Sequence, residues 1–156
     1  MLTATPKRWF SWNYTVSRDD DRLADLDISW WREKGSLAVD GRRYAVYRER
    51  PMSGKFILES DGAIVASAEK PSSLKRRLLI EHAGRRYELK PRSMFTRTFD
   101  LREGSTVVGS LSARGFFSRR MNVDLPETLP LPVRMFVTWL TVLLWKRESE
   151  AAAAGS

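Results

Sequence analysis

The C-terminal part of this chain predicts a helix that is apolar on nearly every side. From Val133 to Trp145, only Arg134, Thr138 and Thr141 form a narrow polar stripe. The two threonine hydroxyls can bond to helix carbonyls one turn back, so even this stripe tolerates burial. A helix that is apolar all round must be buried all round. The rest of the chain therefore has to fold into something that encloses it.

That remaining part of the chain predicts short antiparallel strands. Period-two alternation, as in Tyr44–Glu49 and Phe95–Leu101, recurs in about eleven segments between Phe10 and Leu125. Asp-Gly pairs such as Asp40-Gly41 are typical of tight hairpin turns. Because no long helical pattern interrupts the strands, a parallel sheet with crossover helices is disfavoured.

In a sheet protein of 156 residues, the inside of a barrel is the place that can bury such a helix on all sides. We predict a mainly β fold: a closed antiparallel barrel of about 11–12 strands around a central hydrophobic helix at about residues 133–147. A single domain is expected over residues 1–148. Residues 149–156 are low in complexity and are expected to be a disordered tail or a remnant of cloning.

An internal repeat with an offset of 43 residues supports the barrel. Gly41-Arg42-Arg43-Tyr44 recurs as Gly84-Arg85-Arg86-Tyr87, and Phe56 and Leu58 match Phe99 and Leu101 without a gap. The matches indicate a duplicated unit of about four antiparallel strands.

The sequence predicts neither secretion nor a membrane-spanning helix. The uninterrupted apolar stretch Met135–Trp145 is about 11 residues or ~17 Å of helix, whereas a bilayer core needs roughly 20 residues. The segment Met1–Phe10 has no apolar core of a signal peptide. We therefore expect a cytoplasmic protein, with peripheral membrane association as an option that the charge leaves open.

The amino-acid composition excludes most kinds of catalytic site. The chain has no cysteine and a single histidine, His82, which is expected to make an ordinary hydrogen bond at a strand end. Carboxylates at Asp19–Asp21, Asp25 and Asp27 suit Ca²⁺, but they lack the order and glycine of an EF-hand and favour a solvated loop. No phosphate-binding loop or nucleophile elbow occurs. We expect no enzyme activity, no metal and no cofactor.

The basic surplus is concentrated in the repeat region. The chain has 27 basic and 19 acidic residues, and residues 51–120 alone carry 14 basic against 7 acidic ones. Arginine predominates, and its planar guanidinium can bind phosphate in bidentate fashion. A merely solubilising surface is the plain alternative. The candidate anion- or lipid-binding residues are Lys75, Arg76, Arg77, Arg85, Arg86, Arg92, Arg119 and Arg120.

Two pairs of adjacent aromatic residues could be exposed on the surface rather than buried in the core. Phe116-Phe117 follow Gly115 and are flanked by Arg114 and Arg119, which is the pattern of a membrane-insertion loop with electrostatic support. Trp30-Trp31 should point to opposite faces of a strand, so that at least one faces outward or into a loop. The alternative for both pairs is that they fill the core or plug the barrel ends.

The chain resembles the tubby C-terminal-like fold, which includes the tubby domains, the LURP-one-related proteins and the phospholipid scramblases. The resemblance covers roughly residues 9–147 and rests on the Gly-Arg-Arg-Tyr hairpins, on Lys55–Leu58 followed by Asp61-Gly62, and on Leu129–Pro132 before the apolar helix. It implies a barrel around a C-terminal helix. Tubby domains bind phosphorylated phosphatidylinositol head groups, and scramblases are associated with lipid movement and calcium. No lipid-binding motif of the family can be transferred to particular residues here.

These observations lead to one main functional expectation. We expect a non-catalytic binding module that recognises anionic lipid head groups or other phosphate-bearing partners through an arginine-rich barrel surface. The alternative is a protein–protein interaction or scaffold domain whose basic charge is incidental. Nucleic acid ranks behind both.

Overall fold

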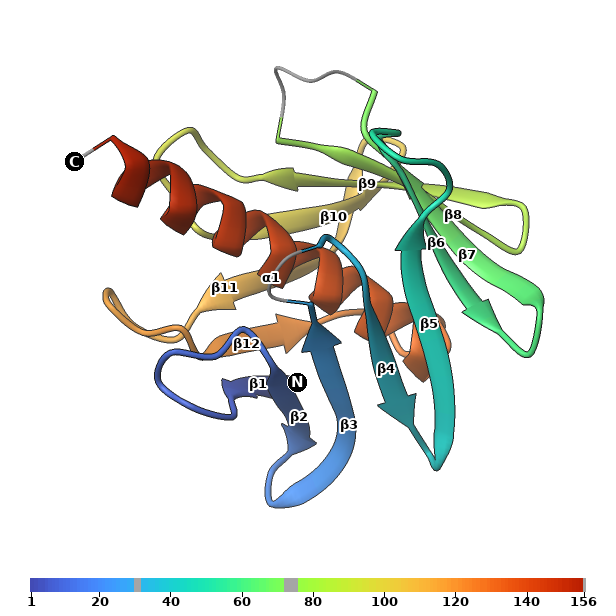
Figure 1. Cartoon of the computed structure of the whole chain (residues 1–156), viewed down its shortest axis with the longest axis horizontal. Helices are drawn as coiled ribbons and strands as arrows, with labels where there is room; N and C mark the ends of the chain where they lie inside the picture. The colour runs from blue at the N-terminus through green and yellow to red at the C-terminus, as the bar shows by residue number, and fades with distance from the viewer. Residues whose placement is uncertain (30–31, 72–75, 156) are drawn as a thin grey trace.

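The structure, a computed structural model, describes residues 1–29, 32–71 and 76–155 (Figure 1). Over these described residues it contains twelve strands followed by one helix. Their bounds are β1 Leu2–Pro6, β2 Tyr14–Arg18, β3 Asp21–Ile28, β4 Gly35–Val39, β5 Arg42–Arg48, β6 Lys55–Ser60, β7 Ala63–Glu69, β8 Leu78–His82, β9 Arg85–Pro91, β10 Phe99–Glu103, β11 Thr106–Ala113, β12 Met121–Asp124 and α1 Leu131–Ala154.

The strands form an antiparallel meander that closes on itself. Each strand pairs with the next along the chain, and β12 closes the barrel by pairing with β1, where Leu2 faces Val123 and Ala4 faces Met121. Closure pairs the two edge strands of the sheet, β1 and β12, with each other, so that neither of these described strands is left as an open edge. The predicted closed barrel of about 11–12 antiparallel strands with one C-terminal helix is thus confirmed.

Glycine-containing turns close the short hairpins as predicted. In the turn between β4 and β5, Asp40 and Gly41 have φ values of 50° and 75°. Positive φ at both central positions is what a two-residue hairpin of the favoured hand requires, and glycine adopts it without steric cost. The same geometry recurs at Asp61-Gly62. The two Gly-Arg-Arg-Tyr segments open β5 and β9, and both bury their tyrosines, Tyr44 and Tyr87.

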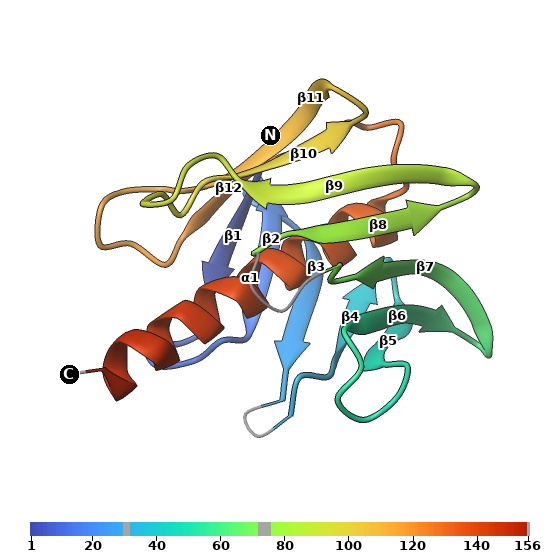
Figure 2. The ribbon, with the colours of Figure 1, turned by 90° about the horizontal axis from the view of Figure 1, so that it is seen from above.

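Helix α1 runs through the barrel from the end where β12 finishes to the opposite end, where the C-terminus emerges (Figures 1 and 2). Every residue from Met135 to Lys146 is buried. The hydroxyls of Thr138 and Thr141 donate to the carbonyls of Arg134 and Val137 over 2.8 and 2.9 Å, which satisfies the polar stripe inside the lumen.

Trp139 fixes the helix to the barrel wall. Its indole Nε1–H donates to the carbonyl of Asp27 on β3 over 3.0 Å. Gly35, which opens β4, faces the same point: a Cβ there would lie 1.8 Å from the Asp27 oxygen and 3.0 Å from Trp139 Nε1. Only a glycine lets β4 approach β3 this closely beside the buried indole.

The helix is longer than the expected range of about 133–147. It begins two residues earlier, because Pro132 lies in the first turn, where a missing N–H costs nothing. At the other end it continues to Ala154, through residues that we expected to form a tail. Alanine has the highest helix propensity, so a buried helix ending in four alanines is readily extended.

Candidate functional site

The two ends of the barrel are built differently. In a meander, alternate connections lie at the same end, and here they alternate in length. Five two-residue turns and the link to α1 form one end, which we call the turn end: residues 19–20, 40–41, 61–62, 83–84, 104–105 and 125–130. Six connections of six to eight residues form the other, the loop end, where α1 emerges: residues 7–13, 29–34, 49–54, 70–77, 92–98 and 114–120.

The charge of the chain is divided between these two ends. In the sequence, the connections of the loop end contain 14 basic and 2 acidic residues. The connections of the turn end contain 5 acidic residues and no basic one. The barrel is therefore strongly polarised along its axis, which a net charge of +8 for the whole chain does not reveal.

Large apolar side chains are exposed at the same end. Trp9 is 87% exposed, Phe95 96% and Phe117 92%, in three different connections. Paired aromatic rings at two of the tips touch edge to face, with centroids 5.3 Å apart for Trp9–Phe10 and 4.8 Å for Phe116–Phe117. The exposed large apolar residues of the described loop-end connections are Trp9, Phe10, Met52, Met94, Phe95, Phe116 and Phe117.

Arg119 holds one of these connections against another. Its guanidinium donates to the carbonyls of Ser11 and Arg8 over 2.6 and 3.0 Å, and also to the carbonyl of Trp9. It lies 4.8 Å from the centre of the Trp12 ring. The connection 114–120 is thereby fixed to the connection 7–13, directly beneath the exposed Trp9.

The hydroxyl of Tyr14 supports this junction from inside the barrel. It donates to the carbonyl of Arg119 over 2.8 Å. Burial raises the pKa of Tyr14 to about 12, against the opposing charges of Arg119 and Arg97, so the phenol stays neutral and remains a donor.

Arg97 joins the connection 92–98 to the connection 114–120 in a similar way. Its guanidinium donates to the carbonyls of Ser118 and Phe116 over 2.8 and 2.7 Å and to that of Gly115 over 3.2 Å. The backbone beneath Phe116 and Phe117 is therefore held in place although both rings face solvent. Three aromatic-tipped connections, 7–13, 92–98 and 114–120, form one connected platform.

The predicted basic residues do not form a single surface. Arg76, Arg77, Arg92, Arg119 and Arg120 lie at the loop end together with Phe116 and Phe117. Arg85 and Arg86 open β9 beside the turn 83–84 and so lie at the turn end. Lys75 lies outside the described residues, as do Trp30 and Trp31.

Most of the predicted arginines are bound to carboxylates of the protein itself. Arg76 pairs with Glu148 on α1, Arg77 with Glu88 over 3.0 Å, and Arg92 with Asp100 over 2.7 Å. At the turn end, Arg85 bonds to Glu103 and Arg86 to Glu81. Within the described part of the chain, Arg8, Arg114 and Arg120 are exposed loop-end arginines whose guanidiniums have no such partner.

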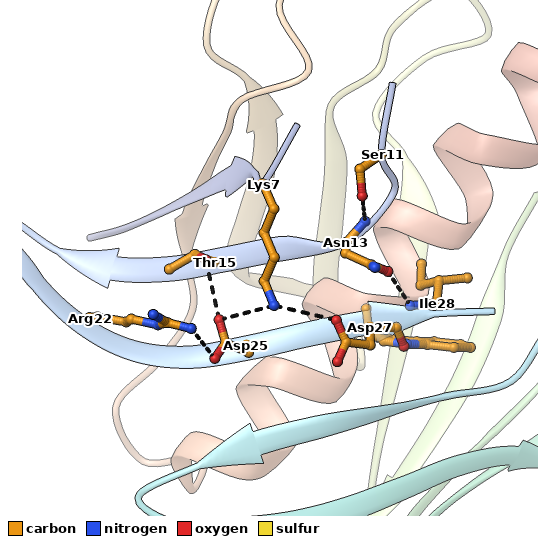
Figure 3. Close-up of polar contacts among 9 residues, drawn as sticks. Lys7, Ser11, Asn13, Thr15, Arg22, Asp25, Asp27 and Ile28 are labelled. Atoms are coloured by element: carbon orange, nitrogen blue, oxygen red, sulfur yellow. Dashed lines mark hydrogen bonds and ion pairs between the residues drawn. The ribbon is translucent and has the colours of Figure 1, made fainter. Parts of the chain in front are cut away.

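The acidic residues of β3 belong to a surface network rather than to an open carboxylate cluster. Lys7 lies 3.5 Å from both Asp25 and Asp27, and Arg22 and Thr15 also bind Asp25 (Figure 3). Partial burial opposes ionisation of Asp25, but the bond from Arg22 and the charge of Lys7 outweigh it and hold its pKa below the usual value. Among the residues that the structure describes, no three metal-ligating side chains come together.

His82 makes the expected hydrogen bond at the end of a strand. Its Nδ1 lies 2.9 Å from the carbonyl oxygen of Val65. Because a carbonyl only accepts, Nδ1 carries the proton in this contact.

Sequence reasoning missed the exposed tips Met52, Met94 and Phe95 and the division of charge between the ends. The signal was present in the spacing of the strands. Once a meander is predicted, every second connection lies at the same end, and the long connections are the basic and aromatic ones. Counting charge along the chain, rather than by alternate connections, concealed this pattern.

Over the described residues, the one helix is not apolar enough over a sufficient length to cross a bilayer. Comparison with known protein families, with curated proteins and with solved structures finds no match to this chain.

Proposed function

We propose that this protein is a non-catalytic module that binds anionic membrane surfaces with its loop end facing the lipid. One observation carries the proposal: exposed aromatic and methionine side chains at the tips of four loop-end connections share that end with nearly all of the surplus positive charge. Aromatic side chains partition into the membrane interface, while lysine and arginine are attracted by anionic head groups.

The unpaired arginines supply the electrostatic part of this proposal. Arg114 and Arg120 flank the Phe116-Phe117 tip, and Arg8 precedes the Trp9-Phe10 tip. Each basic residue near an anionic surface contributes about 1 kcal/mol. The five acidic residues of the turn end are repelled by the same surface. Both effects favour one orientation of the barrel on the membrane.

We also propose that the chain belongs to the tubby C-terminal-like superfamily, as a small member associated peripherally with the membrane. A closed antiparallel barrel of twelve strands around a buried C-terminal helix supports this assignment. Arg76, Arg77 and Arg92 are already paired with carboxylates of the protein, which argues for the exposed loop tips, rather than for these three arginines, as the lipid-binding part.

Charge reversal at the two ends tests the proposal. The variant Arg114→Glu/Arg120→Glu should bind vesicles of phosphatidylcholine and phosphatidylserine more than about thirtyfold less tightly at low salt, since two attractive charges become repulsive. The matched variant Arg42→Glu/Arg43→Glu changes the charge equally on two exposed arginines at the turn end. It should bind nearly as the parent does. Equal loss in both variants, or no binding of the parent at low salt, would overturn the proposal.

A further inference from the structure

A pocket of about 480 Å³ lies at the loop end beside the point where α1 leaves the barrel. Three cations from separate parts of the chain line it: Arg48 at the end of β5, Lys70 just after β7, and Arg147 on α1. Among the described residues of its lining, Glu33 is the one carboxylate. The described lining thus carries two more positive than negative charges.

Glu33 is already fully engaged by the two arginines. Arg147 Nη2 donates to Glu33 Oε1 over 2.6 Å, its Nε donates to Oε2, and Arg48 Nη2 donates to Oε1. Lys70 is the remaining cation, and its ammonium group has no partner among the residues that the structure describes. The charge of Glu150 also reaches Arg147, but Glu150 is bound to Lys146 over 2.5 Å.

The cations are held close to one another at an energetic cost. Partial burial, followed by the charges of Arg147 and Arg48, lowers the pKa of Lys70. Partial burial and the charge of Arg147 likewise lower the pKa of Arg48. An anion in the pocket would relieve this repulsion, because it would supply the charge that the lining lacks.

The walls of the pocket are preorganised. The Phe56 ring lies 5.6 Å from the guanidinium carbon of Arg48 and 5.9 Å from that of Arg147. Arg48 Nη1 donates to the Ser53 carbonyl over 3.2 Å, and the backbone N–H of Lys70 donates to the Gly54 carbonyl over 2.8 Å. The connection 49–54 is therefore folded against the cations before any ligand arrives.

We propose that this pocket binds a phosphomonoester group, whose two negative charges match the surplus on Arg48, Lys70 and Arg147. The group can come from a lipid head group or from a free phosphate ester. The lipid source rests on the proposed function, since it requires the loop end to face the membrane. Binding of a free phosphate does not.

The first arm of the test uses no membrane. Inorganic phosphate titrated into the protein should bind, and Lys70→Gln should weaken binding by about tenfold or more, because one charge-assisted contact is lost. Lys34→Gln removes an equal charge from an exposed loop-end lysine outside this pocket and should leave binding unchanged. Equal unfolding midpoints of the two variants would show that both are folded. If the protein does not bind phosphate, or if both variants bind it with equal affinity, the proposed phosphate site would be overturned.

The second arm distinguishes the sources of the phosphate. Vesicles containing phosphatidic acid, a phosphomonoester lipid, should bind more tightly than phosphatidylserine vesicles of matched surface charge, and Lys70→Gln should abolish this difference. Phosphate binding without any vesicle binding would keep the pocket and refute the membrane proposal. Phosphatidylserine binding without phosphate binding would keep the membrane proposal and refute the pocket.

Discussion

Trp145 on α1 and Arg97 in the connection 92–98 contact each other twice. The indole Nε1–H of Trp145 donates to the Arg97 carbonyl over 3.0 Å, and the Arg97 guanidinium carbon lies 5.1 Å from the centre of the indole ring. Since Arg97 also donates to three carbonyls of the connection 114–120, the buried helix positions two aromatic-tipped loops through Arg97.

Trp145→Phe should therefore loosen the loop end. It leaves the Arg97 carbonyl without its donor, which should cost about 1–3 kcal/mol of unfolding free energy in urea. Hydrogen exchange should accelerate in residues 92–98 and 114–120. Trp139→Phe, which breaks the equivalent bond to Asp27 on β3, is the matched control. It should destabilise the fold without selectively accelerating exchange in those two loops, and a selective effect there would contradict this account.

Leu140→Asp should prevent folding. Leu140 is fully buried halfway along the helix inside the barrel. An unpaired carboxylate there costs several kcal/mol, which is comparable to the roughly 5–15 kcal/mol that stabilises a whole domain. Ala152→Asp, on the exposed part of the same helix, should fold normally. Circular dichroism and thermal unfolding would show the difference, and a cooperatively folded Leu140→Asp protein would contradict the enclosed position of α1.

Phe116→Ser/Phe117→Ser should reduce binding to anionic vesicles by roughly tenfold or more, because two exposed rings no longer enter the interface. The control is Ile64→Ser/Val107→Ser, which removes two exposed apolar side chains near the turn end. Co-sedimentation should show little change for the control. If both double variants bind equally, the Phe116-Phe117 tip is not an insertion element.

The sequence was sufficient to predict the barrel because two strong patterns agreed. Period-two strands with Asp-Gly turns required an antiparallel sheet, and the helix around Leu140, apolar on nearly all sides, required an enclosure. The extension of α1 to Ala154 was missed because a run of alanines carries no burial pattern. It is helical through intrinsic propensity and continuity with a buried helix.

The candidate site was harder to predict because partners distant in sequence decide whether a charge is available. In the sequence, Arg76 has no evident partner and is predicted to be available to an anion. In the structure it is paired with Glu148 on the emerging helix, 72 residues away. Arg48, Lys70 and Arg147 stand far apart in the chain and meet only where α1 leaves the barrel. The aromatic tips, by contrast, could have been placed at one end from the sequence alone, because every second connection of a meander lies at the same end of the barrel.

Alkaline pH should destabilise the protein through Tyr14. Its pKa is about 12 in the folded state and near the ordinary value of 10.0 when unfolded, so the stabilising contribution is complete below pH 10 and is lost as the pH rises towards 12. The loss should be roughly 1 kcal/mol by pH 11 and up to about 3 kcal/mol above pH 12.

Tyr14→Phe separates this effect from the ionisation of other groups. At pH 8 it should be less stable than the parent by about 1 kcal/mol, since the Arg119 carbonyl loses its donor. The difference should shrink and then change sign as the pH rises through 11. A constant difference in unfolding free energy between pH 8 and 11 would show that Tyr14 ionisation does not limit stability.

The orientation on the membrane is the central claim, and the absence of native cysteine allows it to be measured directly. Ser93 in the connection 92–98 and Ser105 in the turn 104–105 are both exposed, at opposite ends of the barrel. Each can be changed singly to cysteine and labelled with a polarity-sensitive fluorophore. On vesicles containing phosphatidylserine, the label on Ser93→Cys should shift to the blue and be quenched by lipid-borne quenchers, while the label on Ser105→Cys should not change. Equal responses at both positions, or a response at Ser105→Cys alone, would contradict the account.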